Sequence, residues 1–500
     1  MTWHVPVVMV YLALLLPCAL LGAQRLWLVW QFLGRRPLPP EPAIDAWPVV
    51  TVQLPLFNER HVASRLLAAV GELDYPRECL EIQVLDDSTD DTKAIVDAGC
   101  QRLRELGFDA QVVRRPTREG FKAGALAAGL RLARGDVLAV FDADFVPTPE
   151  FLRRTVPRLT DGVGMVQARW GHINPTQNWL TEAQSVLLDG HFVVEHAARF
   201  HSGRWFNFNG TAGIWRRQAI EDAGGWQHDT LTEDLDLSYR AQMAGWRFIY
   251  LWDLVQPAEL PVEMAAFKTQ QHRWARGTLQ AARKLIGPLW ASSAPLRIEV
   301  DASVHLLANC AHPLTLAIAL MLPVSIVARG QQGVSAWLIA DALVFALATG
   351  SFALFYAVAV RSSGGGRLAV RLAGLPLALA TGIGMSLAQS RAVWLGLFGS
   401  EGRFVRTPKW GQSVQSYGSR SVSWVRVGES VLALYLWISV GWAMAEGFWA
   451  SIPFLGLFAV GFSVVALGVR EAPATARISR HAPRGHSRPP MATQPGSSPS

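Results

Sequence analysis

The chain has 500 residues, of which 50% are hydrophobic and 17% charged, and its mean hydropathy is +0.20. That composition excludes an ordinary soluble protein and leaves room for one soluble domain of roughly 250 residues beside several membrane helices. The formal charge of +7 does not indicate nucleic-acid binding, because the basic residues are scattered and many flank apolar runs, as in the cytoplasmic loops of membrane proteins.

The first expected element is a membrane helix over residues 6–32, an apolar run closed by Arg35 and Arg36. The run is longer than the core of a signal peptide, and no small-residue cleavage site follows it. The arginine pair predicts that its C-terminal end is cytoplasmic. Arg25, inside the run, is expected to snorkel to the interface or to face protein.

Residues 46–294 have the pattern of a soluble domain. The apolar runs VVTVQLPLF, LEIQVLDDS and GDVLAVFDADF have strand length, end in polar or acidic residues and alternate with helical patterns. This alternation predicts an α/β domain with a largely parallel sheet. In such sheets the functional groups gather at the carboxyl ends of the strands.

Residues 300–470 are expected to return to the membrane. Further runs are long enough to cross it: 304–327, 336–360, 430–448 and 450–469. The segment 372–398 has basic flanks on both sides, so a single crossing would break the positive-inside rule, and an interfacial or re-entrant helix is expected instead. The total is about five spans, four of them in this region. Residues 471–500, rich in Pro, Ser, Arg and His, are expected to be disordered.

Two acidic clusters follow predicted strands. In VLDDSTDDT, Asp86 and Asp87 either belong to a polar turn that caps the next helix or recognise the base or ribose of a nucleotide. In FDADF, Asp142 and Asp144 point to one side of an extended chain, which is costly unless a cation neutralises them. Because hard divalent ions prefer carboxylate and phosphate oxygens, this DxD pair predicts a metal that holds a diphosphate.

A third cluster, LTEDLDLSYR, opens a helical run. Glu233 and Asp234 either favour the helix dipole or supply a general base. Transfer of a sugar requires removal of the proton from the attacking hydroxyl, which is the role predicted for Asp234. Lys122 and Arg273 are candidates for stabilising a leaving nucleoside diphosphate.

The motifs VQLPLFNE, IQVLDDSTD, KAGAL, FDADF, VQARW, FNGTAG, AGGW, TEDLDLSYRA and QQHRW give the chain a family resemblance. Their order and spacing resemble inverting family 2 glycosyltransferases of the cellulose-synthase-like branch, most closely glucomannan (β-mannan) synthase-like proteins. The resemblance covers most of residues 50–290. It implies a GT-A-like nucleotide-sugar-binding fold and a hexosyltransferase that depends on Mg²⁺ or Mn²⁺.

The resemblance also implies roles for individual residues. The nucleotide sugar is assigned to Pro55, Asn58, Glu59, Asp86, Asp87, Lys122, Asp142, Asp144 and Arg273. Asp144 and Asp142 are the implied metal ligands, Asp144 being the direct one, and Asp234 is the catalytic base. The acceptor is assigned to Glu233, Gln270 and Trp274, with Trp274 offering an aromatic face to a sugar ring.

Residues 398–428 resemble the gating loop of cellulose synthases through FVRTPK. The resemblance implies that Phe404, Thr407 and Lys409 close over the nucleotide and exclude water. Arg406 and Pro408 depart from the gating pattern, so an ordinary cytoplasmic loop is the alternative.

Together these features predict a multi-pass membrane protein, in the plasma or inner membrane if the source is bacterial, with a cytoplasmic catalytic domain. The expected activity is processive transfer of hexose from GDP-mannose or UDP-glucose to a growing β-linked polysaccharide, by default β-1,4-linked. The expected partners are the donor, the glycan acceptor and membrane lipids, with no nucleic acid; an export partner is left open. The alternative is a single addition of sugar to a membrane lipid. A catalytically inactive nucleotide-sugar sensor is disfavoured by the intact acidic set.

Overall fold

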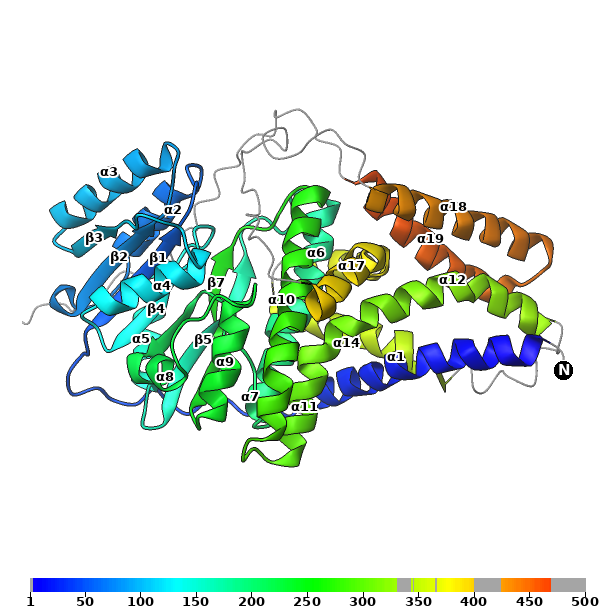
Figure 1. The fold of residues 1–500 in the computed structure, drawn as a ribbon, viewed down its shortest axis with the longest axis horizontal. Coiled ribbons are helices and arrows are strands. Elements are labelled where there is room, and N and C mark those ends of the chain that lie inside the picture. The colour runs from blue at the N-terminus through cyan, green and yellow to red at the C-terminus, as the bar shows by residue number, and fades with distance from the viewer. Residues whose placement is uncertain (1–2, 331–342, 345, 365–366, 400–423, 469–500) are drawn as a thin grey trace, which may run out of the picture. The chain divides into compact units, whose positions relative to one another are not determined.

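The computed structural model describes residues 3–330, 343–344, 346–364, 367–399 and 424–468. These residues form a sheet flanked by helices and a set of long apolar helices (Figure 1).

A seven-stranded sheet, in the order β3-β2-β1-β4-β6-β5-β7, forms the centre of the first part. Its strands are β1 (Val50–Leu56), β2 (Leu80–Asp86), β3 (Asp109–Val113), β4 (Val137–Val140), β5 (Val163–His172), β6 (Gly213–Arg216) and β7 (Arg247–Ala258). β1 pairs in parallel with β2 and β4, β2 with β3, and β5 with β7, whereas β6 is antiparallel to β4 and β5. The expected α/β fold with a largely parallel sheet is confirmed.

Helices pack on both faces of this sheet because successive strand residues point to opposite sides. In β4, Val137 and Ala139 join one apolar core with α2 and α3, while Leu138 and Val140 join another with α4 and α8. The helices of this part are α2 (Ala63–Gly71), α3 (Thr92–Glu105), α4 (Phe121–Leu132), α5 (Phe151–Thr155), α6 (Trp179–Asp189), α7 (His196–His201), α8 (Arg217–Asp222), α9 (Glu233–Met243) and α10 (Met264–Trp290).

The second part consists of apolar helices. They are α1 (His4–Leu33), α11 (Leu296–Leu307), α12 (Ala311–Gly330), α14 (Ser351–Ser363), α15 (Leu368–Ala373), α16 (Leu375–Gly384), α17 (Ser386–Phe398), α18 (Trp424–Ala445) and α19 (Ile452–Leu467). Among the described residues, the segments long and apolar enough to cross a membrane are His4–Leu33, Leu296–Gly330, Trp424–Ala445 and Trp449–Leu467. Several long apolar helices therefore agree with a multi-pass membrane protein.

Two of the apolar segments, 336–360 and 372–398, do not form single straight helices in the residues that the structure describes. Part of the predicted span 336–360 lies outside the described residues, and its described part forms a π-helical turn, η6 (Ala346–Gly350), and then α14. The segment 372–398 forms α16 and α17, and the helix pair Leu368–Gly384 and Ser386–Phe398 is bent by 45°, as in a broken span or a re-entrant loop. An interfacial or re-entrant helix at this segment stays a prediction.

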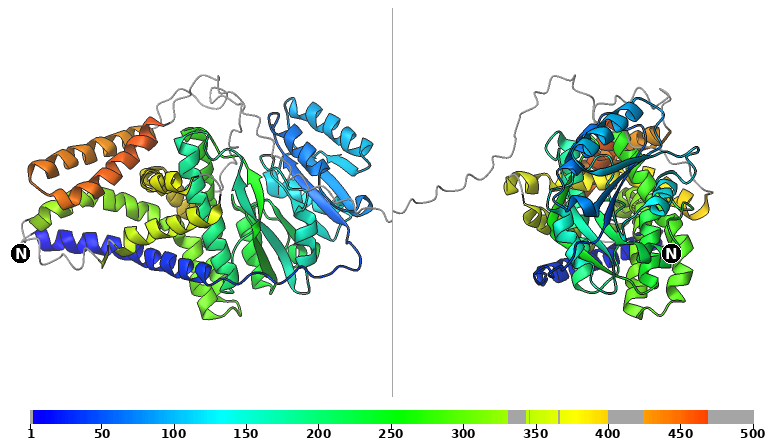
Figure 2. Two further views of the ribbon diagram at one scale, coloured as in Figure 1. Left: turned by 180° about the vertical axis from the view of Figure 1, so that it is seen from behind. Right: turned by 90° about the vertical axis from the view of Figure 1, so that its left-hand side faces the viewer.

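Helix α1 reaches into the apolar core of the part that contains the sheet. Leu28, Val29 and Phe32 of α1 are buried in the apolar core that also contains β4 residues, and α1 packs against α12 and α14 as well (Figure 2). Arg25 donates to Glu195 Oε2 at 2.7 Å. Of the two environments expected for Arg25, the structure therefore shows the one in which it faces protein.

Candidate active site

A cavity lies where β1, β2 and β4 end, with α9 and α10 on its other side. It brings together most of the residues that the sequence singled out, which come from six separate segments of the chain. Those that line it are Pro55, Glu59, Asp87, Lys122, Asp142, Asp144, Glu233, Asp234, Gln270, Arg273 and Trp274. The carboxyl edge of the sheet thus collects the acidic clusters in one place, as expected of an α/β fold.

Asp86 and Asn58 do not line the cavity. The Asp86 carboxylate accepts from Arg114 Nε at 2.9 Å and from the Ser88 amide at 3.0 Å, and its side chain is fully buried. Asn58 adopts a positive φ of 56° and accepts from the Thr89 amide at 2.8 Å. Both side chains therefore brace the loops after β1 and β2, and the nucleotide contact expected for them stays a prediction.

The residues assigned to a gating loop, Phe404, Thr407 and Lys409, lie outside the described residues. Their closing over the nucleotide stays a prediction from the sequence.

Asp87 is held by Arg115, which follows β3, the strand beside β2. Arg115 donates to Asp87 through Nε at 3.1 Å and Nη2 at 2.5 Å, and also to the backbone carbonyls of Glu119 and Phe121. A two-pronged contact of this kind fixes the plane of the carboxylate. Asp87 is thereby presented to the cavity in one orientation while Asp86, the preceding residue, is turned into the protein.

Lys122 is the central cation of the cavity. Its Nζ lies 2.6 Å from Asp142 Oδ1 and 4.0 Å from Glu233 Oε1, and it donates to the Gly210 carbonyl at 2.8 Å. Burial alone would lower the pKa of Lys122, but Asp142 and Glu233 raise it above its usual value. The ammonium group is therefore charged and available to a diphosphate beside the DxD carboxylates.

The surroundings of Asp234 raise the pKa of its carboxyl group. Burial is the largest cause that raises its pKa, the neighbouring Glu233 raises it further, and the result is about 7 in spite of Lys122 and Arg273. Its Oδ1 accepts from the Leu235 amide at 2.8 Å. A carboxylate with a pKa near neutrality can take a proton during the reaction and release it afterwards.

The loop FNGTAG contributes a residue to which the sequence assigned no role. Gly210 has a φ of 80°, and a Cβ there would lie 2.8 Å from Asp234 Oδ2 and 3.2 Å from Lys122 Nζ. A side chain at this position would displace Asp234 or Lys122. The glycine in FNGTAG could have predicted this close approach, because glycine is used where the backbone must come near another group.

Gln270, Arg273 and Trp274 lie on one face of α10, at the spacing i, i+3 and i+4. The Trp274 ring lies 6.5 Å from that of Trp170 at the end of β5, at an interplanar angle of 59°. Both tryptophans line the cavity. The QxxRW segment thus supplies one wall of the cavity, and the VQARW motif, for which no role was predicted, supplies an aromatic neighbour.

The DxD pair suits a divalent cation. Asp142 and Asp144 both line the cavity and offer only oxygen ligands. In the part of the chain that the structure describes, no group of three or more His, Cys, Asp or Glu side chains forms a metal site by itself. The pair therefore fits a hard cation whose other ligands come from a bound diphosphate and water.

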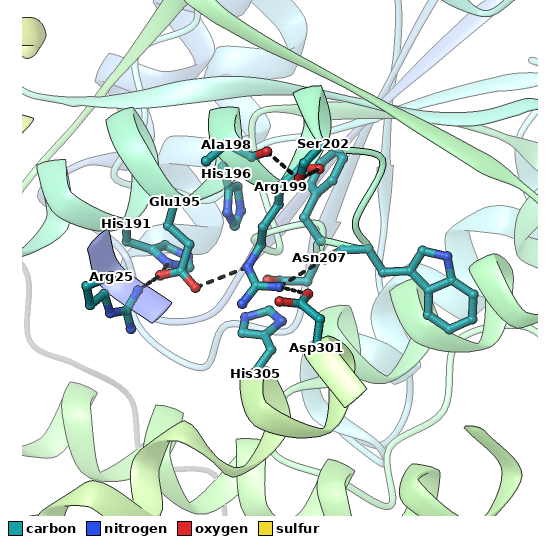
Figure 3. Close-up of polar contacts among 12 residues, drawn as sticks. Arg25, His191, Glu195, His196, Ala198, Arg199, Ser202, Asn207, Asp301 and His305 are labelled. Atoms are coloured by element: carbon teal, nitrogen blue, oxygen red, sulfur yellow. Dashed lines mark hydrogen bonds and ion pairs between the residues drawn. The ribbon is translucent and has the colours of Figure 1, made fainter. Parts of the chain in front are cut away.

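A second charged cluster lies outside the cavity. Figure 3 shows Glu195 between Arg25 and Arg199, which pair with it at 2.7 and 3.1 Å, and Asp301 on Arg199 at 2.5 Å. His191 also contacts Glu195, at 3.3 Å. Burial opposes ionisation of Glu195, but these cations hold its pKa well below the usual value. The cluster joins α1, the segment before α7, and α11.

This cluster is connected to the active-site loop through His196, which is fully buried. His196 Nε2 lies 3.1 Å from Oδ1 of Asn209, the residue before Gly210, and Asn209 lines the cavity. Burial lowers the pKa of His196 well below its usual value, so the ring is neutral. The first membrane helix and the FNGTAG loop are therefore parts of one packed unit.

Comparison with known sequences finds a family match for part of the chain. Residues 48–277 match the family described as "Glycosyltransferase like family 2". Glucomannan 4-beta-mannosyltransferase 2 of Arabidopsis thaliana is 46% identical over 246 residues, 48% of this chain and 46% of the relative. Glucomannan 4-beta-mannosyltransferase 1 of Oryza sativa subsp. japonica is 40% identical over 276 residues, 54% of this chain and 52% of the relative. The chain thus spans about half the length of these curated relatives.

A solved structure has a similar fold. The mannosyltransferase PcManGT from Pyrobaculum calidifontis, in complex with GDP-Man and Mn²⁺, superposes with a TM-score of 0.52 at 23% identity, covering 79% of this chain and 99% of that one. This similarity confirms the predicted GT-A-like fold with additional helices. The resemblance of the motifs to family 2 glycosyltransferases is likewise confirmed by the family match.

Proposed function

We propose that this chain, whose residues 48–277 form a family 2 glycosyltransferase domain, is an inverting transferase that adds mannose from GDP-mannose to a growing β-1,4-linked glycan at a membrane. UDP-glucose is the competing donor. One observation carries the proposal. Asp234, whose pKa is raised to about 7, lines the same cavity as Lys122 and the DxD carboxylates, and two tryptophans line it as well.

The donor half of the cavity is the edge formed by Asp87, Lys122, Asp142 and Asp144. Asp87, held by Arg115, would accept hydrogen bonds from the base or ribose. Lys122 and Arg273 would neutralise the diphosphate as it leaves the sugar. Asp142 and Asp144 would hold a divalent cation, which, when bound, stabilises the negative charge of the leaving diphosphate.

The acceptor half of the cavity is the wall formed by Trp170 and Trp274. An apolar aromatic face suits the C–H face of a sugar ring. An acceptor hydroxyl placed between this wall and Asp234 attacks the anomeric carbon on the side opposite to the diphosphate, and its proton passes to the Asp234 carboxylate. That direction of attack inverts the configuration and gives a β-linkage from an α-linked donor.

The test uses purified protein in lipid vesicles with Mg²⁺ or Mn²⁺. Radiolabelled GDP-mannose and UDP-glucose are supplied separately, and the product is digested with linkage-specific β-mannanase and cellulase. We expect a polymer from GDP-mannose that β-mannanase degrades. Polymer from UDP-glucose alone would make the enzyme a glucan synthase. Label only in an organic-extractable lipid would replace polymerisation with a single addition.

Asp234→Asn tests the base directly. The amide keeps the size and the hydrogen-bonding shape of the side chain but cannot take a proton. We expect transfer to fall by about 10²-fold or more while the affinity for GDP, measured by calorimetry, stays within about twofold. Near-wild-type polymer formation by this variant would exclude Asp234 as the base.

A further inference from the structure

The end of β5 presents a histidine to the cavity that none of the roles above uses. Trp170 and His172 are two residues apart on this strand, so their side chains share one face. Both line the cavity, and Trp170 is the tryptophan that neighbours Trp274. His172 therefore belongs to the aromatic, acceptor-facing half of the site.

The His172 ring is fixed from behind by a buried carboxylate. Nε2 lies 3.1 Å from Oδ1 of Asp189, the last residue of α6, and the two side chains are only 8% and 5% exposed. The other oxygen of Asp189 accepts from Arg371 Nη2 at 2.5 Å. Arg371, on α15, is itself held by Ser363 Oγ at 2.7 Å and by the Gly364 carbonyl at 3.0 Å.

This chain of contacts determines which ring nitrogen carries a proton. Burial favours a neutral Asp189, but His172 and Arg371 outweigh it and lower the pKa of the carboxyl group. An ionised carboxylate only accepts hydrogen bonds, so Nε2 of His172 must donate. In the neutral ring, Nδ1 is then the acceptor, and its tautomer is fixed by Asp189.

We propose that His172 binds a hydroxyl group of the acceptor sugar, and that Asp189 and Arg371 are positioning residues that fix its ring and tautomer. The inference rests on the proposed transferase function and adds a polar anchor to a wall otherwise made of tryptophans. Stacking on an aromatic face leaves a sugar free to rotate in the plane of the ring. One directional acceptor beside that face selects a single orientation, and with it the hydroxyl that reaches Asp234.

The test separates acceptor use from donor chemistry. The assay contains GDP-mannose, the proposed donor, and soluble β-1,4-mannohexaose. It compares wild-type enzyme with the variants His172→Ala, His172→Asn and Asp189→Asn. Two rates are measured: transfer to the oligosaccharide as a function of its concentration, and donor hydrolysis without it. Loss of one hydrogen bond predicts a rise of about three- to tenfold in the acceptor KM for His172→Ala. Donor hydrolysis and GDP affinity are expected to stay within about twofold of wild type.

The other variants distinguish direct contact from mere packing. The amide of His172→Asn reaches the position of Nδ1 but not that of Nε2, so it is expected to recover part of the acceptor affinity. Asp189→Asn no longer enforces one tautomer and is expected to raise the acceptor KM less than His172→Ala does. His61→Gln, at an exposed histidine, is the control for changing a histidine.

Two results would overturn the assignment. The first is an unchanged acceptor KM for His172→Ala in an enzyme that still makes polymer. The second is an equal loss of transfer and of donor hydrolysis, which would indicate a general structural role. A wild-type enzyme that forms no glycan from any nucleotide sugar would instead overturn the proposed function, so the two failures are distinguishable.

Discussion

At the residue scale, the carboxylates of the cavity differ in the charged groups that lie beside them. Asp142 pairs with Lys122, and Asp87 pairs with Arg115. Asp234 is partly buried beside Glu233, a like charge, and its pKa rises to about 7. Carboxylates of one cavity thus have different partners, and Asp234 is the one whose pKa is raised by burial and by Glu233.

The raised pKa of Asp234 predicts the pH dependence of the reaction. A base acts as its anion, and below pH 7 a growing share of Asp234 is protonated, so kcat/KM should fall about tenfold per pH unit on the acid side. Glu233→Gln removes the like charge and should move this acid limb to lower pH. Burial is the larger cause and remains in this variant. The pKa read from the acid side of the profile should therefore stay above that of an ordinary carboxyl group. An unchanged acid limb in Glu233→Gln would contradict the coupling.

Lys122 is expected to serve the donor and the base together. Lys122→Met removes the charge beside Asp142 and a cation that lowers the pKa of Asp234. We expect the donor KM to rise by about 10- to 100-fold, from loss of hydrogen bonds between charged groups. The acid limb should move to higher pH, and steady-state kinetics over a pH series measure both effects. Lys93→Met, at an exposed position on α3, is the matched control.

At the scale of elements, α10 links the catalytic cavity to the membrane helices. One part of α10 presents Gln270, Arg273 and Trp274 to the cavity, and the helix also packs against α17. Gln280, further along α10, accepts from the Leu231 amide at 3.0 Å, just before the TED motif. The QxxRW and TED motifs are therefore held together by one helix.

Gly277 sets the distance between α10 and the TED motif. A Cβ at this position would lie 2.6 Å from Thr232 Cγ2 and 2.9 Å from the Thr232 amide nitrogen. Gly277→Ala should therefore push Thr232, and with it Asp234, out of place and cost about 1–3 kcal/mol of stability. We expect kcat to fall by more than about tenfold, because small displacements of a base are costly.

The same helix provides the control for this prediction. Gly287, also in α10, has no heavy atom within 4 Å of the place where its Cβ would lie. Gly287→Ala should leave activity unchanged, because its Cβ would touch no other element; no gain in stability is expected, since Pro288 follows and disfavours helical φ and ψ for an alanine at this position. Thermal unfolding in detergent and turnover assays compare the two variants. Equal activity in both would show that the approach of α10 to Thr232 is not required.

At the scale of the whole molecule, the buried ionic cluster makes the first membrane helix part of the catalytic unit. Arg25 of α1 pairs with Glu195, Glu195 with Arg199, and Arg199 with Asp301 at the start of the second membrane segment. Leu28 and Phe32 of α1 lie in the same core as the sheet. An arginine in a membrane helix is tolerated when it faces protein and is paired, which is the case here.

Removing Arg25 should therefore destabilise the fold as a whole. Arg25→Gln removes one charged hydrogen bond to the buried Glu195, which still pairs with Arg199, so a loss of about 1.5–3 kcal/mol of stability is expected. The change should lower the midpoint of thermal unfolding in lipid nanodiscs. Arg36→Gln, at the exposed end of the same region, is the matched control. Equal midpoints for the two variants would show that the Arg25 to Glu195 pair contributes nothing measurable.

Much of the site could be predicted from the sequence because strands and motifs carry local signals. An apolar run that ends in FDADF or VLDDS identifies both a strand and its functional end, and parallel strands bring such ends together. The sequence could not predict that Asp87 lines the cavity while Asp86 is buried, since the two residues are adjacent at the end of the same strand. It depends on Arg114 and Arg115, which come from another strand and take one carboxylate each.

The sequence by itself determined the fold class, the family resemblance, the apolar helices and eleven of the residues that line the cavity, because periodicity and motif chemistry are properties of short segments. The tertiary structure decided what depends on contacts between distant segments: the antiparallel course of β6, the pairing of Arg25 with Glu195, and the approach of Gly277 to Thr232. It also decided the link from His172 through Asp189 to Arg371, which spans nearly two hundred residues of chain. Such contacts leave no local pattern, since each partner alone is compatible with many neighbours and only the packed fold selects one.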